Sequence, residues 1–173
     1  DTLLRLYPGH VSARAIKAAL LATDGKLAEA TAAGEALIKQ YPTDPDAAIL
    51  LGTLYSLQNA HQRVEPVLKR AIEAHPQDLD LLNSLAMAYM RMGNHAKAES
   101  IFRSILSVEP NVYDHHLKLA LFFDQQQQYE KAETTLREAL RLEPDSEQRH
   151  LALADYLAGR RNMTTAEAAL IEA

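Results

Sequence analysis

The 173-residue chain contains no cysteine and no tryptophan, and it has only six glycines. Without cysteine it can form no disulfide, no thiolate zinc site and no cysteine nucleophile. The six glycines are dispersed, and the motifs G-x-S-x-G, G-x-x-x-x-G-K and G-x-G-x-x-G are all missing. The sequence therefore offers no catalytic residue, phosphate-binding loop or cofactor site, and we predict a non-enzymatic chain with no cofactor.

The sequence also lacks basic clusters and long apolar runs. Lysine and arginine number 18 against 23 aspartates and glutamates, which gives a net charge of −5. This balance disfavours a nucleic-acid partner. No stretch of 18 uncharged apolar residues occurs, so we expect no membrane insertion. The absence of cysteine is compatible with the cytoplasm and the periplasm alike, and the sequence leaves the localisation unknown.

Seven histidines raise the question of a metal site. The densest group is His115, His116 and His150, but no two ligands stand four residues apart on one helix with a third converging group, as helical zinc sites require. We predict that these histidines are structural and that the chain holds no metal.

What the chain does have is a strict proline period. Five prolines lie 34 residues apart, namely Pro8, Pro42, Pro76, Pro110 and Pro144. Proline lacks a backbone donor and forces the preceding residue out of the helical region, so each proline ends a helix at the same point of a repeated unit. A fixed period of this length is typical of stacked helical repeats.

Other residue types recur with the same period when Val11, Pro45, Leu79, Tyr113 and Glu147 are taken as position 1 of successive repeats. Small residues occupy position 8, and large ones occupy position 11. Small residues favour a close approach of two helices, and large ones fill the space between units. The two sets are Ala18, Gly52, Ala86, Ala120 and Ala154, and Leu21, Tyr55, Tyr89, Phe123 and Leu157.

This pattern resembles the tetratricopeptide repeat (TPR) family over 11–173. The third repeat carries the signature most fully, in Leu82, Leu85, Ala86, Tyr89, Gly93, Ala98, Phe102 and Pro110. The resemblance implies an all-α, right-handed α-solenoid of antiparallel helix pairs, A and B, with a concave face lined mainly by A helices. We expect a single array over 1–173, divided into a tail of a preceding repeat (1–10), full repeats at 11–44, 45–78, 79–112 and 113–146, and an incomplete repeat at 147–173.

Several local features are predicted within the repeats. Gly25 and Gly93 should take the positive φ that a helix end favours, and Asp44, Asp78 and Ser146 should cap A helices. Pro66 falls inside the second B helix, which we expect to be shortened or kinked. The proline is tolerated if that helix starts near Arg63, since donors of the first turn have no partner within the helix.

The concave face is the candidate binding surface. Its predicted lining is apolar in the middle, which suggests a site for an apolar peptide or helix. The alternative, that superhelical curvature buries these side chains between A helices, stays open. The predicted peptide-binding residues are Ile49, Thr53, Asn83, Met87, Met90, Leu117, Lys118, Leu121, Leu151 and Asp155.

Three carboxylates, Asp46, Asp80 and Asp114, form a predicted acidic rim along this face. The rim would favour a basic ligand, but acids in a first helical turn are also stabilised by the helix dipole. The clamp by which some TPR domains hold chaperone carboxylate tails is missing, because only Lys118 matches it and Asp114 has the wrong charge.

Three functions are compatible with the sequence. The first, which we prefer, is a non-catalytic protein–protein interaction scaffold that binds a peptide or helix of a partner in its concave groove. The second is an architectural or self-associating segment of a longer array, for example in a bacterial envelope or polysaccharide-export assembly. The third is a regulatory domain of an enzyme whose catalytic part lies outside these residues. The partner's identity does not follow from the sequence.

Overall fold

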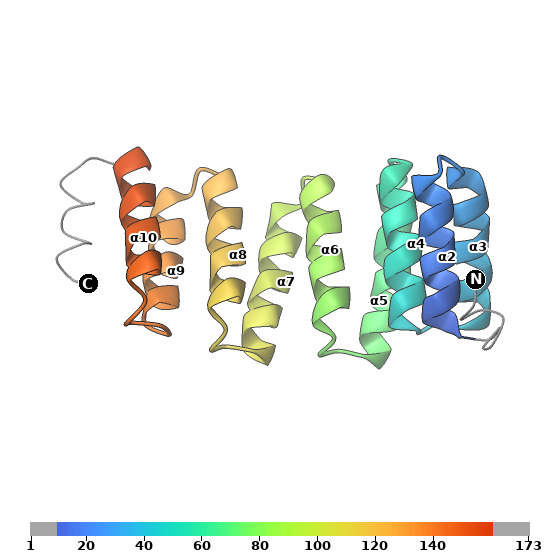
Figure 1. The fold of residues 1–173 in the computed structure, drawn as a ribbon, viewed down its shortest axis with the longest axis horizontal. Coiled ribbons are helices and arrows are strands. Elements are labelled where there is room, and N and C mark those ends of the chain that lie inside the picture. The colour runs from blue at the N-terminus through green and yellow to red at the C-terminus, as the bar shows by residue number, and fades with distance from the viewer. Residues whose placement is uncertain (1–9, 161–173) are drawn as a thin grey trace. The chain divides into compact units, whose positions relative to one another are not determined.

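The computed structural model describes residues 10–160, in which all regular structure is helical (Figure 1). The predicted tail at 1–10 falls almost entirely outside this range, as does 161–173 of the fifth repeat. The α-helices are α2 (Val11–Thr23), α3 (Leu27–Gln40), α4 (Pro45–Leu57), α5 (Val64–Ala74), α6 (Leu79–Arg91), α7 (His95–Val108), α8 (Tyr113–Gln125), α9 (Tyr129–Leu140) and α10 (Glu147–Arg160), with a 3-10 helix, η1 (His61–Arg63), before α5.

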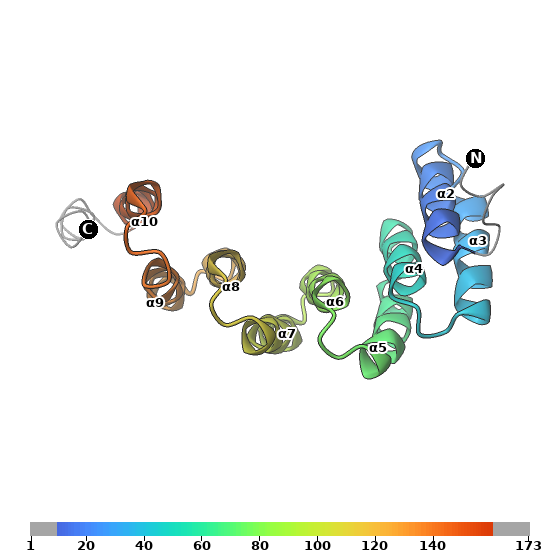
Figure 2. The same ribbon diagram turned by 60° about the horizontal axis from the view of Figure 1, so that its bottom comes forward.

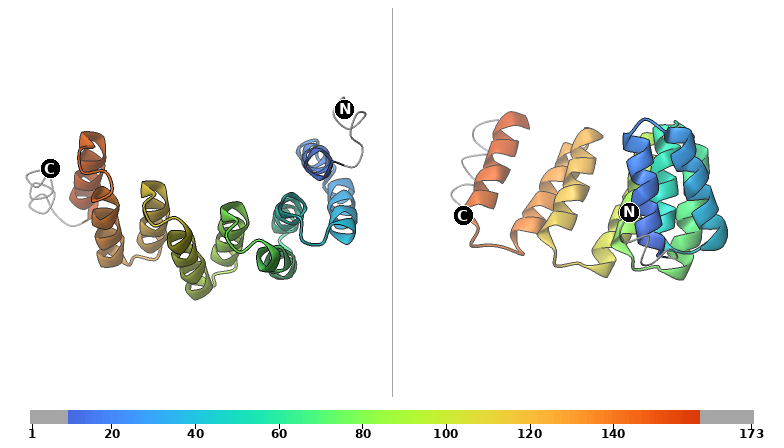
Figure 3. Two further views of the ribbon diagram at one scale, coloured as in Figure 1. Left: turned by 90° about the horizontal axis from the view of Figure 1, so that it is seen from below. Right: turned by 45° about the vertical axis from the view of Figure 1, so that its right-hand side comes forward.

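The chain divides into two compact units, Asp1–Ile101 and Phe102–Ala173, and the boundary lies within α7. In the first unit the A helices α2, α4 and α6 form one layer, and the B helices α3 and α5 form a second (Figure 2). Helix α4 packs directly against α2, α3, α5 and α6. In the second unit α9 packs against both α8 and α10 (Figure 3). Consecutive helices within each unit are antiparallel, as the repeat pattern predicts.

The A helices begin where the proline period places them, at Val11, Pro45, Leu79, Tyr113 and Glu147. Aspartates immediately before two of these helices satisfy free backbone donors of the first turn. The Asp44 carboxylate accepts from the Ala47 amide at 3.0 Å, and the Asp78 carboxylate accepts from the Asp80 and Leu81 amides at 3.0 Å each. Two of the three predicted caps, Asp44 and Asp78, are therefore confirmed.

The turns between A and B helices need one residue with positive φ. Gly25 and Gly93 supply it, with φ of 79° and 69°, as predicted. The matching residues of the other two described turns are Asn59 (φ 57°) and Gln127 (φ 58°). The left-handed conformation disfavours residues with a Cβ, and asparagine tolerates it better than glutamine does. The Gln127 turn is therefore the more strained of the two.

Pro66 shortens the second B helix. Helix α5 has 11 residues, whereas α3 has 14, and η1 fills the space before it. Since α5 begins at Val64, Pro66 is its third residue and lies in the first turn, where a missing donor costs no helical hydrogen bond. The prediction of a shortened helix is confirmed.

Small residues at position 8 are buried and permit close helix packing. Ala18, Ala86 and Ala120 are each at most 1% exposed. Gly34 serves the same purpose at a position where the other repeats have a larger residue. A Cβ at Gly34 would lie 3.3 Å from the Cδ1 atoms of Leu51 and Leu54. These leucines of α4 therefore fill the space beside Gly34, and the first repeat has no gap there.

A cation lies over an aromatic ring in three successive repeats, eight residues after the aromatic residue in the chain. The distances to the ring centroid are 4.0 Å for Arg63 over Tyr55, 5.0 Å for Lys97 over Tyr89, and 5.2 Å for Lys131 over Phe123. Such contacts contribute about 0.5–1 kcal/mol at exposed sites. Each pair joins the A helix of a repeat to the start of its own B region.

Carboxylates from the preceding repeat bind two of these cations. Arg63 Nη2 donates to Glu35 Oε1 at 2.9 Å and to the Tyr55 hydroxyl oxygen at 2.7 Å. Lys97 Nζ lies 3.1 Å from Glu65 Oε1, which also accepts from Lys69 at 2.8 Å. The hydrogen bonds from Lys69 and Lys97 lower the pKa of Glu65 to about 2. The Glu65 side chain thus contacts a lysine of its own repeat and a lysine of the next repeat, and it joins the two repeats.

Candidate functional site

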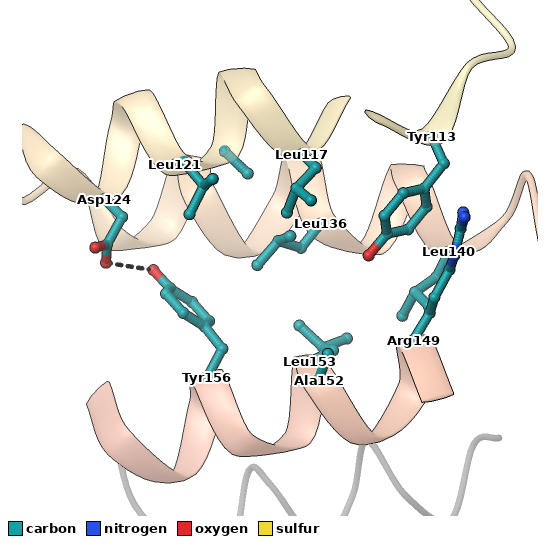
Figure 4. A pocket seen from close by; sticks show the side chains of 11 residues that line it. Tyr113, Leu117, Leu121, Asp124, Leu136, Leu140, Arg149, Ala152, Leu153 and Tyr156 are labelled. Atoms are coloured by element: carbon teal, nitrogen blue, oxygen red, sulfur yellow. Dashed lines mark hydrogen bonds between the residues drawn. The ribbon is translucent and has the colours of Figure 1, made fainter. Parts of the chain in front are cut away.

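A cavity of ≈ 160 Å³ lies between α8 and α10, with α9 forming its floor (Figure 4). All of its lining belongs to the second unit. Most of the lining side chains are apolar, and they are Tyr113, Leu117, Ala120, Leu121, Asp124, Leu136, Leu140, Arg149, Ala152, Leu153 and Tyr156.

Two polar contacts close the ends of this cavity. At one end the guanidinium carbon of Arg149 lies 3.5 Å from the centroid of the Tyr113 ring. Arg149 also forms an ion pair with Glu143, with 2.6 Å between Nη1 and Oε1. At the other end the Tyr156 hydroxyl donates to Asp124 Oδ1 at 3.1 Å, as the dashed line in Figure 4 shows. These contacts hold α8 and α10 together at both ends and leave the apolar middle open.

The middle of the cavity combines rigid and exposed apolar groups. Leu153 and Leu140 are 4% and 7% exposed and belong to the core of the unit, whereas Leu121 is 51% exposed. Burial raises the pKa of Tyr113 above its ordinary value. The positive charge of Arg149 lowers this pKa, and the negative charges of Asp114 and Glu143 raise it, so that the net shift is upward. The Tyr113 hydroxyl is therefore neutral at physiological pH and presents no charge to the cavity.

Only two of the predicted peptide-binding residues, Leu117 and Leu121, line this cavity. Lys118, Leu151 and Asp155 are exposed on α8 and α10 but do not contribute to its lining.

The remaining predicted contacts lie in the first unit, on α4 and α6. Met87 is 46% exposed, and Thr53 is also exposed. Ile49, Asn83 and Met90 are half-buried. Asn83 Nδ2 donates to the Leu79 carbonyl oxygen within its own helix at 2.6 Å. Among these residues, Met87 therefore offers the largest apolar side chain to a ligand.

The acidic rim residues Asp46, Asp80 and Asp114 are all exposed and occupy the first turns of α4, α6 and α8. Their place at helix N-termini is favourable through the helix dipole alone. The presence of these three aspartates at helix N-termini is therefore no evidence by itself for a basic ligand.

Sequence reasoning missed the residues that close the cavity: Tyr113, Arg149 and Tyr156. A signal was present in the repeat columns. Arg149 occupies position 3, where the preceding repeats have Ala13, Ala47, Leu81 and His115, and Tyr156 occupies position 10, where they have Leu20, Leu54, Ala88 and Phe122. In the fifth repeat each of these two columns therefore has a longer polar side chain than in any preceding repeat.

His116 and His150 both bind a backbone carbonyl. Each Nε2 lies 2.8 Å from the oxygen of the repeat proline six residues earlier, Pro110 or Pro144. Both imidazoles thus tie the start of an A helix to the end of the preceding repeat, as expected for a structural role. Across residues 10–160 no group of three histidine, aspartate or glutamate side chains is arranged to hold a metal ion. Within the same range, no helix has the length and apolar character needed to cross a membrane.

Two family models match the chain. The N-terminal TPR repeats region of Psidin matches residues 1–105, and a tetratricopeptide repeat model matches residues 90–156. No curated protein matches significantly.

Solved structures of TPR proteins share the fold at low sequence identity. MamA 41-end from Desulfovibrio magneticus RS-1 has a TM-score of 0.65 at 16% identity, covering 95% of this chain and 93% of that one. A tetratricopeptide repeat protein from Parabacteroides merdae has a TM-score of 0.66 at 18% identity, covering 95% and 78%. A thermophilic TPR protein from Thermus thermophilus has a TM-score of 0.62 at 22% identity, covering 92% and 88%.

These matches agree with the helical repeats and the signature residues of the third repeat. Proteins built from such repeats generally act as non-catalytic scaffolds for protein–protein interaction. With a family model matching more than half of its length, the chain belongs to the tetratricopeptide repeat family.

Proposed function

We propose that the chain is a non-catalytic protein-binding module and that the cavity between α8 and α10 receives one apolar side chain of a partner peptide or helix. The observation that carries this proposal is Leu121, which is 51% exposed beside a cavity whose lining includes the buried residues Ala120, Leu136, Leu140 and Leu153. Apolar surface in such a position gains free energy when a ligand covers it.

The size of the cavity suits a single side chain. An apolar cavity of about 150 Å³ in another protein holds a benzene molecule, and this one measures ≈ 160 Å³. A leucine or phenylalanine side chain of the partner therefore matches the available space. The polar ends, formed by Arg149 with Tyr113 and by Asp124 with Tyr156, would position the flanking backbone or polar groups of the ligand.

The first unit has exposed residues of its own, which do not line the cavity. Met87, on α6 of that unit, is a flexible apolar side chain and suits an apolar contact of its own. We propose that Asp46, Asp80 and Asp114 favour a partner with lysine or arginine near its apolar anchors, which would affect the association rate and its dependence on salt.

The proposal can be tested with peptides selected from a random peptide library against the intact chain. We expect selected peptides to share one large apolar residue. Leu121→Asp should weaken their binding at least tenfold, because a carboxylate would be placed against the apolar cavity wall. Isothermal titration calorimetry measures the affinity, and circular dichroism checks that the variant keeps its helices.

Leu57→Asp is a matched control, since Leu57 on α4 is 58% exposed and belongs to the other unit. It should leave the affinity within about twofold of the original value. Unchanged binding by the Leu121→Asp variant, or an equal loss in both variants, would show that the cavity is not the binding site.

A further inference from the structure

Two tyrosine rings form the ends of the cavity between α8 and α10, and they come from opposite helices. Tyr113 extends from α8 towards α10, and Tyr156 extends from α10 towards α8 (Figure 4). The lining between them is aliphatic and includes Leu117, Leu121 and Leu153. A ligand group in the middle of the cavity therefore lies between two aromatic rings.

Each ring is held by a polar contact on the side away from the middle of the cavity. The guanidinium carbon of Arg149 lies 3.5 Å from the centroid of the Tyr113 ring and so covers one of its faces. Figure 4 shows this ring between Arg149 and the leucines of the cavity. The Tyr156 hydroxyl donates to Asp124 Oδ1 at 3.1 Å. Because both rings are held in place before a ligand binds, their ordering adds little to the cost of binding.

The two rings are specific to this pair of A helices. Tyr113 occupies position 1 of its repeat, and Tyr156 occupies position 10 of the next repeat. The corresponding pairs earlier in the sequence are Val11 with Leu54, Pro45 with Ala88, and Leu79 with Phe122. None of these pairs has two aromatic residues. The aromatic ends are therefore a property of this cavity and not of the repeat pattern.

We propose that the anchor of the partner is a phenylalanine, which Tyr113 and Tyr156 select over leucine. This preference rests on the proposed function, in which the cavity receives one apolar side chain. A phenyl ring matches the cavity volume of ≈ 160 Å³. Aromatic rings in edge-to-face or offset-stacked contact attract one another beyond the effect of the area that they bury. An aliphatic side chain buries similar surface but lacks this attraction.

Selection from a random peptide library against three forms of the intact chain tests this proposal. Peptides that bind the unchanged chain should share phenylalanine, and not leucine, as their large apolar residue. Tyr113→Leu should remove this preference, whereas Tyr113→Phe keeps the ring and should preserve it. Circular dichroism checks that both variants keep their helices. Selected peptides that share leucine would overturn the proposal.

Replacement of the anchor by cyclohexylalanine in a selected peptide isolates the contribution of the aromatic ring. This side chain has about the size of phenylalanine but no π system. Isothermal titration calorimetry gives the Kd of both peptides, and their ratio should shift in favour of cyclohexylalanine by about threefold or more in the Tyr113→Leu variant. A ratio that is the same in the unchanged chain and in this variant would contradict selection by the ring.

Leu121→Asp separates a failure of this preference from a failure of the proposed function. If that variant weakens binding and leucine anchors prevail, the cavity is the binding site but does not select an aromatic ring. If Leu121→Asp leaves binding unchanged, or if the selected peptides share no apolar residue, the cavity is not the site and the preference falls with it.

Discussion

The A helices α4 and α6 pack directly against each other in the first unit, whereas α8 and α10 enclose a cavity in the second. Two of the repeat positions at which α6 and α10 differ bear on this contrast. Helix α6 has Leu81 and Ala88, both at most 2% exposed, where α10 has Arg149 and Tyr156. Arg149 and Tyr156 are larger and polar, and they contact α8 through the ends of their side chains. We call α4 and α6 the closed pair, because they pack directly, and α8 and α10 the open pair, because a cavity lies between them.

The largest expected difference is in the cost of removing a leucine. Leu81→Ala should lower the free energy of unfolding by about 3 kcal/mol, because Leu81 is fully buried and its loss leaves a cavity. Leu121→Ala should cost only about 0.5 kcal/mol, since its side chain is half exposed. Urea unfolding of both variants measures the contrast, and equal costs would contradict the distinction between the two helix pairs.

Placing the residue of the open pair in the closed one should also destabilise the fold. Ala88→Tyr inserts a ring at a position that is 2% exposed, and overpacking of this kind costs about 2 kcal/mol. The reverse exchange, Tyr156→Ala, removes the hydrogen bond to Asp124 and should widen the cavity at a cost of about 1 kcal/mol. Thermal unfolding compares the variants, with Tyr156→Phe isolating the hydroxyl group.

The first unit is also stabilised by the carboxylate of Glu65 on α5, which pairs with Lys69 of the same helix and Lys97 of α7. Its pKa in the folded chain is about 2, below the ordinary 4.5, so the unfolded chain takes up this proton first as the pH falls. The stabilisation is therefore present above pH 4.5 and is lost between about pH 4.5 and 2. Glu65→Gln should cost about 1 kcal/mol at pH 7 and nothing near pH 2.

Urea unfolding at several pH values measures this effect, and Glu73→Gln on the same helix serves as the control. If the cost of Glu65→Gln stays constant across this range, the contacts of the Glu65 carboxylate with Lys69 and Lys97 do not stabilise the first unit.

The smallest expected effect concerns the turns. Gln127→Gly in the second unit should stabilise the fold by about 0.5–1 kcal/mol, because glycine takes positive φ without strain. Asn59→Gly in the first unit should gain only a few tenths of a kcal/mol, since asparagine tolerates this conformation. Differential scanning calorimetry gives both values, and a loss of stability in Gln127→Gly would contradict the proposed strain.

The sequence predicts the helix pairs well because their signals are local. A proline ends each B helix, an aspartate begins α4 and α6, and a small residue permits each close approach. Gln127 shows the limit of this reasoning, since its own preferences give no indication of positive φ and only the alignment with Gly25 and Gly93 reveals it.

The candidate site was predicted only in part. Leu117 and Leu121 follow from the A-helix periodicity, but the cavity itself depends on how Arg149 and Tyr156 reach across to Tyr113 and Asp124. Such contacts depend on the distance between two helices, which a single repeat does not specify. The best sequence signal for such contacts is a residue, such as Arg149 or Tyr156, that differs from the other residues at its repeat position.

The contact of Lys97 with Tyr89 and Glu65 has a consequence for how such a chain can change in length. The aromatic partner belongs to the same repeat and the acidic partner to the preceding one. Removal of residues 79–112 would bring Lys131, with its own ring Phe123, into the place of Lys97 beside Glu65. Loss of this 34-residue unit would thus leave the Glu65 carboxylate facing a lysine with its own aromatic ring, so this contact is compatible with a change in length by complete repeats.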